Sequence, residues 1–378
     1  MLFTKEDLQK FQAECLDDKI QRSLAKIAEW YSRWEYAVYV AFSGGIDSSV
    51  LADLCAKWCK ISNRPLYLVF SDTGLEFPEI RKHVKYFAKW LEEKYEIEVH
   101  LEIVRPEMRF DQVIKTHGYP IISKEVSNTI RGARKSIANG IYSHRLCKLG
   151  VTADEYGGLY DSGKYNYEES LKNSKFKAPK WRPLLDLDCD ISEKCCQIMK
   201  KDPMAAYEKR TGRKPIIGTM ACESMNRENA WFKNGCNAFN GKKPKSTPMA
   251  FWLKQDVLQY VKRFNLPIAS VYGEVVYENE PDQFRIEEYD LQNCGTEKLR
   301  TTGCERTGCI FCGFGCHLEE LPSRFERLKE THPRQYDYCI NGGEYDENGV
   351  WKPTKQGLGM GHVFDELNKI YGEDFIKY

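Results

Sequence analysis

Short apolar runs that end in small or polar residues predict a parallel sheet early in the chain. Residues 37–42 are apolar or aromatic and stop at Ser-Gly-Gly, residues 43–45, which predicts a buried strand and a tight turn. The next segment carries apolar residues at helical spacing: Val50, Leu51, Leu54 and Trp58. Residues 65–70 form a second such run, again followed by an amphipathic segment. This alternation favours an α/β fold with a parallel twisted sheet and helices on both faces.

Periodicity also suggests how the chain divides. Residues 97–103 alternate apolar and polar positions, which indicates a strand with one less buried face. Residues 1–35 carry a helical pattern. We therefore expect an N-terminal helical segment (1–35), an α/β domain (36–290) and a small C-terminal cysteine-rich module (291–378).

The glycine turn is a candidate phosphate site. A strand, a glycine turn and a helix present backbone N–H groups and a helix N-terminus to a phosphate. No Gly-Lys-Ser/Thr follows, so this is not the Walker loop. A second loop, residues 71–79, follows the second strand, and ligands of such sheets lie at the carboxyl ends of the strands. The candidate ligand-binding residues of these two loops are Ser43, Gly44, Gly45, Asp47, Ser48, Ser71, Asp72, Thr73 and Gly74.

Composition narrows the class of protein. The net charge is +1 with 29% charged residues, so any basic surface must be local. No apolar run approaches the ~18 residues that span a bilayer, and the first residues do not resemble a signal peptide. We therefore expect a cytoplasmic protein without a membrane partner. Fifteen cysteines in such a protein point to metal or redox chemistry rather than to disulfides.

Four of these cysteines lie close together. Cys304, Cys309, Cys312 and Cys316 fall within 13 residues that include a Cys-x-x-Cys pair. Structural zinc sites usually set two pairs a dozen or more residues apart. The compact run suits a 4Fe–4S cluster better, with zinc or redox thiols as alternatives.

The two nucleotide loops carry a resemblance to a known family. Residues 43–48, Ser-Gly-Gly-Ile-Asp-Ser, resemble the pyrophosphate (PP) loop of the adenine-nucleotide alpha-hydrolase superfamily. Residues 70–79, Phe-Ser-Asp-Thr-Gly-Leu-Glu-Phe-Pro-Glu, are similar to the Asp-Thr-Gly segment of its phosphoadenosine-phosphosulfate (PAPS) reductase branch. The resemblance implies binding of ATP or adenylyl sulfate with Mg²⁺. It also implies catalytic roles for Asp47, Asp72 and Arg227, the last in a segment that matches the family's Glu-Ser/Arg helix.

The resemblance extends to the cysteines. Adjacent Cys195 and Cys196 resemble the pair that ligates an iron–sulfur cluster in adenylylsulfate reductases. That analogy implies Cys195, Cys196, Cys309 and Cys312 as ligands, whereas the local run implies Cys304, Cys309, Cys312 and Cys316. We favour the local run at this stage, which leaves Cys195 and Cys196 as candidate sulfur carriers.

The cysteine-rich end is similar to enzymes that put sulfur into nucleic acid, such as the DNA phosphorothioation sulfurtransferase and cluster-bearing tRNA thiolases. Reductase-like proteins of this kind occur in phages and other mobile elements. The reductases attack sulfate with a cysteine in a Glu-Cys-Gly-type tail, and this sequence has no such motif. Cys339 is its only cysteine after Cys316.

Three hypotheses follow. The first is an ATP pyrophosphatase that adenylates an acceptor, with nucleic acid as the expected acceptor, for cluster-dependent sulfur transfer from a cysteine desulfurase. The second is a PAPS or adenylyl sulfate reductase that releases sulfite with a thioredoxin-like donor. The third is a non-catalytic subunit that binds a nucleotide and a cluster. Separately, Lys124, Arg131, Arg134 and Lys135 on a helix expected at 121–138 either contact phosphates or form a solvated face.

Overall fold

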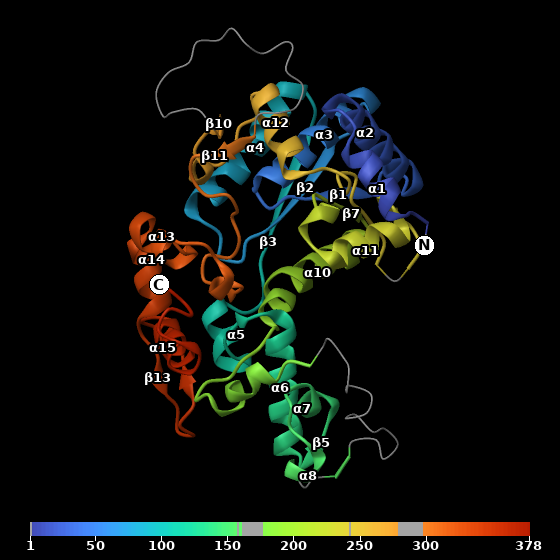
Figure 1. Cartoon of the computed structure of the whole chain (residues 1–378). Helices are drawn as coiled ribbons and strands as arrows, with labels where there is room; N and C mark the ends of the chain where they lie inside the picture. The colour runs from blue at the N-terminus through green and yellow to red at the C-terminus, as the bar shows by residue number, and fades with distance from the viewer. Residues whose placement is uncertain (1, 157–158, 161–176, 242, 279–297) are drawn as a thin grey trace. The chain divides into compact units, whose positions relative to one another are not determined.

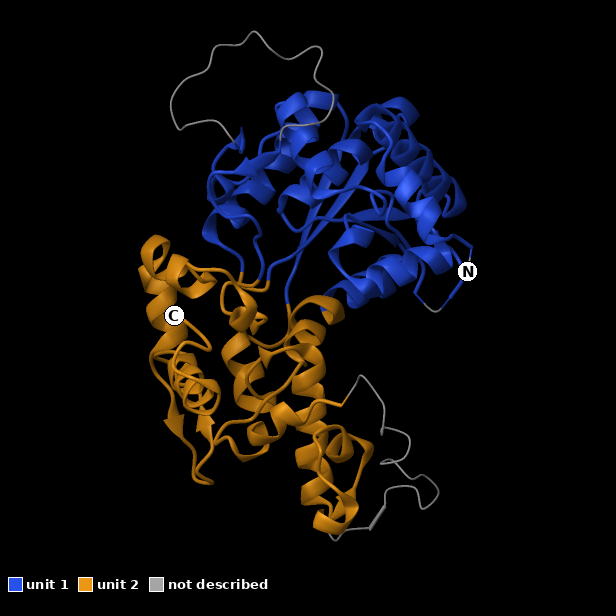
Figure 2. Ribbon diagram, viewed as in Figure 1, with its two compact units in different colours: residues 1–72, 76–105, 203–308 blue, residues 73–75, 106–202, 309–378 orange. Residues whose placement is uncertain are grey.

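The computed structural model describes residues 2–156, 159–160, 177–241, 243–278 and 298–378 (Figure 1). The chain divides into two compact units (Figure 2). Unit 1 comprises Met1–Asp72, Glu76–Arg105 and Pro203–Gly308, and unit 2 comprises Thr73–Leu75, Pro106–Asp202 and Cys309–Tyr378. The domain boundary expected between residues 290 and 291 lies outside the described residues, and the expected three-part division stays a prediction.

Unit 1 is built on a six-stranded sheet of order β3-β2-β1-β7-β9-β8. Its strands are β1 (Val38–Ala41), β2 (Leu66–Ser71), β3 (Val99–Val104), β7 (Lys214–Ile217), β8 (Asn237–Ala238) and β9 (Lys245–Ser246). All neighbouring strands are parallel except β8, which runs antiparallel to β9. From β1 the chain adds β2 and then β3 on one side of the sheet, whereas β7 lies on the other side of β1. Open α/β sheets bind their ligands at such a switch in strand order, here between β1 and β7.

Side chains on the two faces of the sheet alternate, as the pleat requires. Val38, Val40 and Leu68 point into the main core with the helices, whereas Tyr39 and Val69 pack with Tyr207 on the opposite face. Helices α2 (Leu16–Arg33), α3 (Ile46–Ser62), α4 (Pro78–Tyr95) and α12 (Lys254–Arg263) contribute to the main core, and α10 (Asp202–Thr211) covers part of the other face. The expected α/β fold, with a mostly parallel sheet flanked by helices, is confirmed.

The remaining elements complete the two units. Unit 1 also contains α1 (Lys5–Gln12), η3 (Ala221–Glu223), α11 (Met225–Asn234), η4 (Ser270–Tyr272), β10 (Val275–Tyr277) and β11 (Leu299–Thr301). Unit 2 contains α5 (Phe110–His117), β4 (Ile121–Ile122), α6 (Lys124–Ala138), β5 (Ile141–Tyr142), α7 (His144–Lys148), α8 (Ala153–Tyr156), β6 (Leu159–Tyr160), η1 (Pro179–Asp186), η2 (Gln197–Lys201), β12 (Gly313–Phe314), η5 (Cys316–Leu318), α13 (Arg324–Thr331), α14 (Pro333–Ile340), β13 (Glu344–Tyr345), β14 (Trp351–Lys352) and α15 (Met360–Tyr371). Among the described residues, no helix combines the length and apolarity needed to cross a membrane.

A buried carboxylate ties three helices of unit 1 together. Asp53 of α3 is fully buried and accepts hydrogen bonds from Tyr95 at 2.8 Å and from Tyr260 of α12 at 2.5 Å. Lys94 of α4 lies 3.1 Å from the same carboxylate, and Lys57 lies 3.3 Å away. A buried charge is tolerated only when it is paired and hydrogen-bonded in this way. The network therefore fixes α3, and with it the turn at its N-terminus.

The buried His83 should make the stability of unit 1 depend on pH in the acidic range. Its buried ring lies 3.3 Å from the Ser49 hydroxyl, and burial lowers the pKa of His83 from 6.5 to about 4. The unfolded chain therefore binds this proton more readily. The contribution of neutral His83 to the free energy of unfolding is fully present above pH 6.5. It is lost as the pH falls toward 4, by up to roughly 3 kcal/mol.

The measurement is urea unfolding between about pH 7 and about pH 4.5 for the wild type and His83→Gln. We expect the free energy of unfolding of the variant to depend less on pH in this window. Equal slopes for the two proteins would contradict the prediction, and the comparison cancels the other histidines because both proteins contain them.

Candidate functional site

The PP-loop joins β1 to α3 and is closed by its own side chains. The Ser48 hydroxyl donates to the Gly45 carbonyl at 2.8 Å, and the Ser43 backbone N–H donates to the Ser48 hydroxyl at 3.2 Å. Gly45 is the N-cap of α3 and provides no side-chain hydrogen bond to this helix end. The Ile46 N–H bonds to the Tyr272 hydroxyl, and the other N–H groups of the first turn of α3 form a candidate anion site.

The two glycines of the loop differ in backbone conformation and in the space around them. Gly44 has φ +74°, and a Cβ there would lie 2.8 Å from Val84 Cγ2 and 2.9 Å from Ile80 Cγ2. Gly45 has an ordinary φ of −77°, and its nearest neighbour would be the Tyr272 hydroxyl at 3.2 Å. Gly44 therefore sets the loop backbone, whereas Gly45 keeps the loop surface open.

We expect Gly44→Ala to destabilise the protein by roughly 1–3 kcal/mol, because the substitution is strained in φ and overpacks against α4. Gly45→Ala is the matched control and should change the free energy of unfolding much less. The measurement is denaturant unfolding of both variants beside the wild type. A Gly45→Ala variant that loses more stability than Gly44→Ala would contradict the assignment.

Asp47 is half-buried in the first turn of α3, where cations surround it. Burial raises the pKa of Asp47, while Arg306, Lys254 and Arg227 act in the opposite direction. Arg227 of α11 forms an ion pair with Glu223, and burial is the main cause that lowers the pKa of Arg227. The structure thus brings Asp47 and Arg227 together, as expected for residues of one phosphate site.

A segment that the sequence did not suggest, residues 303–308, lies on the PP-loop. Its backbone is held by the Gly303 and Cys304 N–H groups, which donate to the carbonyls of Tyr272 and Val271, both at 2.9 Å. The Tyr272 hydroxyl bonds to Thr307, and a Cβ on Gly45 would lie 3.5 Å from the Thr307 hydroxyl. No sequence pattern signals these contacts, because they join residues far apart in the chain.

The Asp-Thr-Gly loop divides between the two units. Asp72 of unit 1 is buried and pairs with Arg81 at 2.7 Å and with Arg105 at 3.5 Å. Ser71 ends β2, whereas Thr73 and Gly74 belong to unit 2. Asp72 is therefore neutralised by two arginines, a state that the sequence did not indicate.

Two backbone pairings in unit 2 position its cysteine pairs. Strand β12 runs parallel to β4, with Gly313 opposite Ile121, and this places the Cys309–Cys312 turn beside the start of α6. The segment before Cys195 is fixed to the same region, because Tyr119 N–H donates to the Asp190 carbonyl at 2.7 Å. The Arg131 side chain of α6 also donates to Glu193 at 3.0 Å. Both pairs are thereby attached to residues 118–131.

The four cysteines interact electrostatically. Cys195 donates a hydrogen bond to Cys196, which together with nearby Lys124 lowers the pKa of Cys196 to about 5. The pKa of Cys195 is raised by that bond, by burial and by the neighbouring Cys196, Cys312 and Cys309. A π-helical turn, Gln197–Lys201, follows directly, and Ile122 has a φ of +62°, which a β-branched residue rarely adopts. Such irregular backbone is concentrated at functional sites.

Cys304 and Cys316 have different surroundings. Cys304 belongs to unit 1, and Cys309, Cys312 and Cys316 belong to unit 2. The buried Cys316 thiol donates to the Gly313 carbonyl at 3.0 Å, and burial raises the pKa of Cys316 to about 12. It lies within electrostatic range of Cys312 but is engaged with its own turn.

The surroundings of Cys195, Cys196, Cys309 and Cys312 fit an anionic thiolate cluster. Lys124 lies in the first turn of α6, and Arg324 donates to the Cys312 carbonyl at 2.8 Å. The N-terminus of α6 adds a positive dipole end. In the part of the chain that the structure describes, no three His, Cys, Asp or Glu side chains are arranged around a single ion.

The basic helix expected at 121–138 forms as α6, but two of its arginines serve the fold. Arg134 donates to the backbone carbonyls of Leu184, Leu185, Leu187 and Cys189 at 2.6–3.2 Å. Arg131 pairs with Glu193. Both guanidinium groups are therefore engaged within unit 2, which favours a structural role, and their contact with phosphates stays a prediction.

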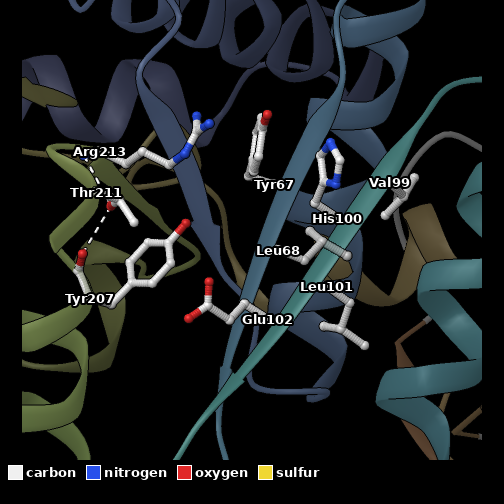
Figure 3. A pocket seen from close by; sticks show the side chains of 9 residues that line it. All are labelled: Tyr67, Leu68, Val99, His100, Leu101, Glu102, Tyr207, Thr211 and Arg213. Carbon is white, nitrogen blue, oxygen red and sulfur yellow. Dashed lines mark hydrogen bonds between the residues drawn. The ribbon is translucent and has the colours of Figure 1, made fainter.

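Unit 1 also has a cavity of about 560 Å³ (Figure 3). It is lined by Tyr67, Leu68, Val99, His100, Leu101, Glu102, Tyr207, Thr211 and Arg213. These residues lie near the start of β2, at positions 99–102 of β3, on α10 and just before β7, whereas the PP-loop follows the carboxyl end of β1. The Arg213 guanidinium already lies 3.3 Å from the centre of the Tyr67 ring, and Glu102 pairs with Arg210. The cavity is therefore separate from the nucleotide loops.

Comparison with known proteins places the chain in a family. No curated protein matches it. Among solved structures it is similar to the NMN synthetase from Francisella tularensis, with 13% identity over 67% of this chain and 72% of that chain and a TM-score of 0.29. A similarity of this size carries no argument about the site.

The family match is more extensive. Residues 37–136 and 160–313 match the phosphoadenosine phosphosulfate reductase domain. These ranges span more than half of the chain and include the PP-loop, Asp72, Arg227 and both cysteine pairs. Together with the parallel sheet and its phosphate loop, this match shows that the chain belongs to the phosphoadenosine phosphosulfate reductase domain family.

Proposed function

We propose that this protein is an ATP pyrophosphatase that adenylates an acceptor, with nucleic acid as the expected acceptor, and prepares it for iron–sulfur-dependent sulfur transfer. Family membership supports a nucleotide-utilising enzyme of the PP-loop superfamily. The observation that carries the finer proposal is the convergence of Cys195, Cys196, Cys309 and Cys312 in a chain that also has a PP-loop.

In the nucleotide step, an acceptor oxygen attacks the α-phosphorus of ATP, the α–β phosphoanhydride bond breaks, and pyrophosphate leaves with the electron pair. The backbone of Ser43, Gly44, Gly45 and Ser48 binds the pyrophosphate part. Asp47 and Asp72 hold Mg²⁺ or orient the nucleotide, for which Asp72 must loosen its pairs with Arg81 and Arg105. Arg227 balances the charge that develops on the phosphates.

For the cluster we propose Cys195, Cys196, Cys309 and Cys312 in place of the local run. Lys124, Arg324 and the N-terminus of α6 offset the negative charge of thiolates at this position. When bound by these four thiolates, a 4Fe–4S cluster would supply sulfide-level sulfur for the replacement of AMP on the adenylated acceptor. A cysteine desulfurase is the class of partner that supplies this sulfur as a persulfide, and a thioredoxin-like thiol reductant supplies the two electrons that convert it to sulfide.

The reductase alternative needs an accessible thiol nucleophile, and Cys339 does not provide one. Cys339, the candidate after the cluster, is 0% exposed, and its thiol contacts Met360 Sδ at 3.6 Å. Burial also raises the pKa of Cys339, and the thiolate is the attacking form.

The test is an assay of anaerobically purified protein. We expect iron and sulfide at about four each per chain, and pyrophosphate release from ATP that increases with DNA or RNA. Sulfite release from adenylyl sulfate or PAPS with thioredoxin would instead support the reductase. Tight ATP binding without turnover would support the non-catalytic subunit.

A further inference from the structure

The segment 303–308 contributes a cation to the nucleotide site that no family motif described above assigns. Arg306 has a side chain that is 76% exposed and lies 3.4 Å from the Glu223 carboxylate. It is also the leading cation acting on Asp47. Arg306 therefore stands at the start of α3 next to the PP-loop, with its guanidinium on the solvent side.

The segment is placed firmly enough to position that arginine. Gly303 approaches the backbone of Val271 so closely that a Cβ would lie 2.4 Å from the carbonyl oxygen. Lys254 pairs with Glu305 at 2.9 Å, and Tyr272 bonds to Thr307. The residues on either side of Arg306 are thus both fixed to unit 1.

Glu223 holds both arginines of the site. It forms ion pairs with Arg227 and Arg306, and its other contact is the Met220 N–H at 3.0 Å. One carboxylate is thus shared by two guanidinium groups, so neither arginine has Glu223 to itself. The exposed Arg306 pair at 3.4 Å is the weaker of the two and the easier to exchange for a ligand.

We propose that Arg306 is a specificity-determining residue that binds the polyphosphate of a nucleoside triphosphate, exchanging Glu223 for the β- and γ-phosphates. The inference rests on the proposed function, in which the PP-loop holds the pyrophosphate part of ATP. Arg306 returns to Glu223 when pyrophosphate has left. It selects for a triphosphate over a nucleotide with a single phosphate, because only the former carries the β- and γ-phosphates.

The experiment measures binding by calorimetry, with ATP, inorganic pyrophosphate and AMP as separate probes and without turnover. For Arg306→Ala we expect the affinity for ATP and pyrophosphate to fall by ~10- to 100-fold while the affinity for AMP stays unchanged. Arg306→Lys should lose less, because it keeps the charge but not the two-pronged contact. Arg210→Ala is the matched control, since Arg210 is another exposed arginine of unit 1 with one acidic partner, Glu102.

The outcomes separate two failures. Wild-type affinity for pyrophosphate in Arg306→Ala, or an equal loss for AMP, would overturn the assignment of Arg306 alone. A wild-type protein that binds neither ATP nor pyrophosphate would count against the proposed function itself. Thermal unfolding of each variant checks the fold, which an exposed arginine should affect little.

Discussion

Cys196→Ser and Cys309→Ser are each expected to purify anaerobically without the cluster, whereas Cys304→Ser and Cys316→Ser keep about four irons per chain. Serine removes one of the four soft thiolate ligands and leaves the local shape nearly unchanged. The measurements are iron and sulfide content and the visible spectrum. This is an all-or-none difference, because a cubane with a missing ligand is exposed to solvent and to exchange.

The four variants form their own control set. All replace sulfur by oxygen, and they differ in whether the thiol belongs to the group around Cys195 and Lys124. Loss of iron in Cys304→Ser and Cys316→Ser with retention in Cys196→Ser would restore the local run as the ligand set. A colourless wild-type protein that holds one zinc would reject both sets and make the cysteines structural.

Local patterns were sufficient for the sheet and the phosphate loop. The apolar runs at 37–42 and 65–70 became β1 and β2, and the alternating run at 97–103 became the edge strand β3, whose residues are mostly half-buried. Each of these predictions depends on a signal within a dozen residues, such as period-two alternation or a glycine turn. The position of the PP-loop at the carboxyl end of β1 follows from the same signals plus general rules for parallel sheets.

Contacts between distant segments were not predictable in this way. The distance from Arg306 to Glu223 spans 83 positions of sequence, and the pairing of β4 with β12 joins residues 121 and 313. The sequence analysis favoured the local run of cysteines as cluster ligands because sequence spacing reports only on residues that are close together in the chain. The structure instead brings Cys195 and Cys196 to Cys312 through the register of β4 and the bond between Tyr119 and Asp190.

Asp47→Asn is expected to cut Mg²⁺-dependent pyrophosphate release by at least ~10²-fold while the protein still folds and binds ATP. Asparagine has the shape of aspartate, so the first turn of α3 keeps its packing. It lacks the negative charge that a hard cation such as Mg²⁺ requires. Without Mg²⁺, the affinity for ATP should be unchanged or higher, because Arg227, Lys254 and Arg306 then act on the phosphates without an opposing carboxylate.

Asp47 also determines in which direction the activity should change with pH. Burial raises the pKa of Asp47, so this carboxylate takes up its proton at a higher pH than an ordinary aspartate. Activity should therefore fall as the pH is lowered, and Asp47→Asn should lack this acid limb in whatever activity it retains. Asp17→Asn serves as the control, because Asp17 is an exposed carboxylate of unit 1 that pairs with Arg263 at 2.8 Å. Full pyrophosphate release by Asp47→Asn would show that the carboxylate neither holds the metal nor orients the nucleotide, and the phosphate chemistry would then rest on the loop backbone and its cations alone.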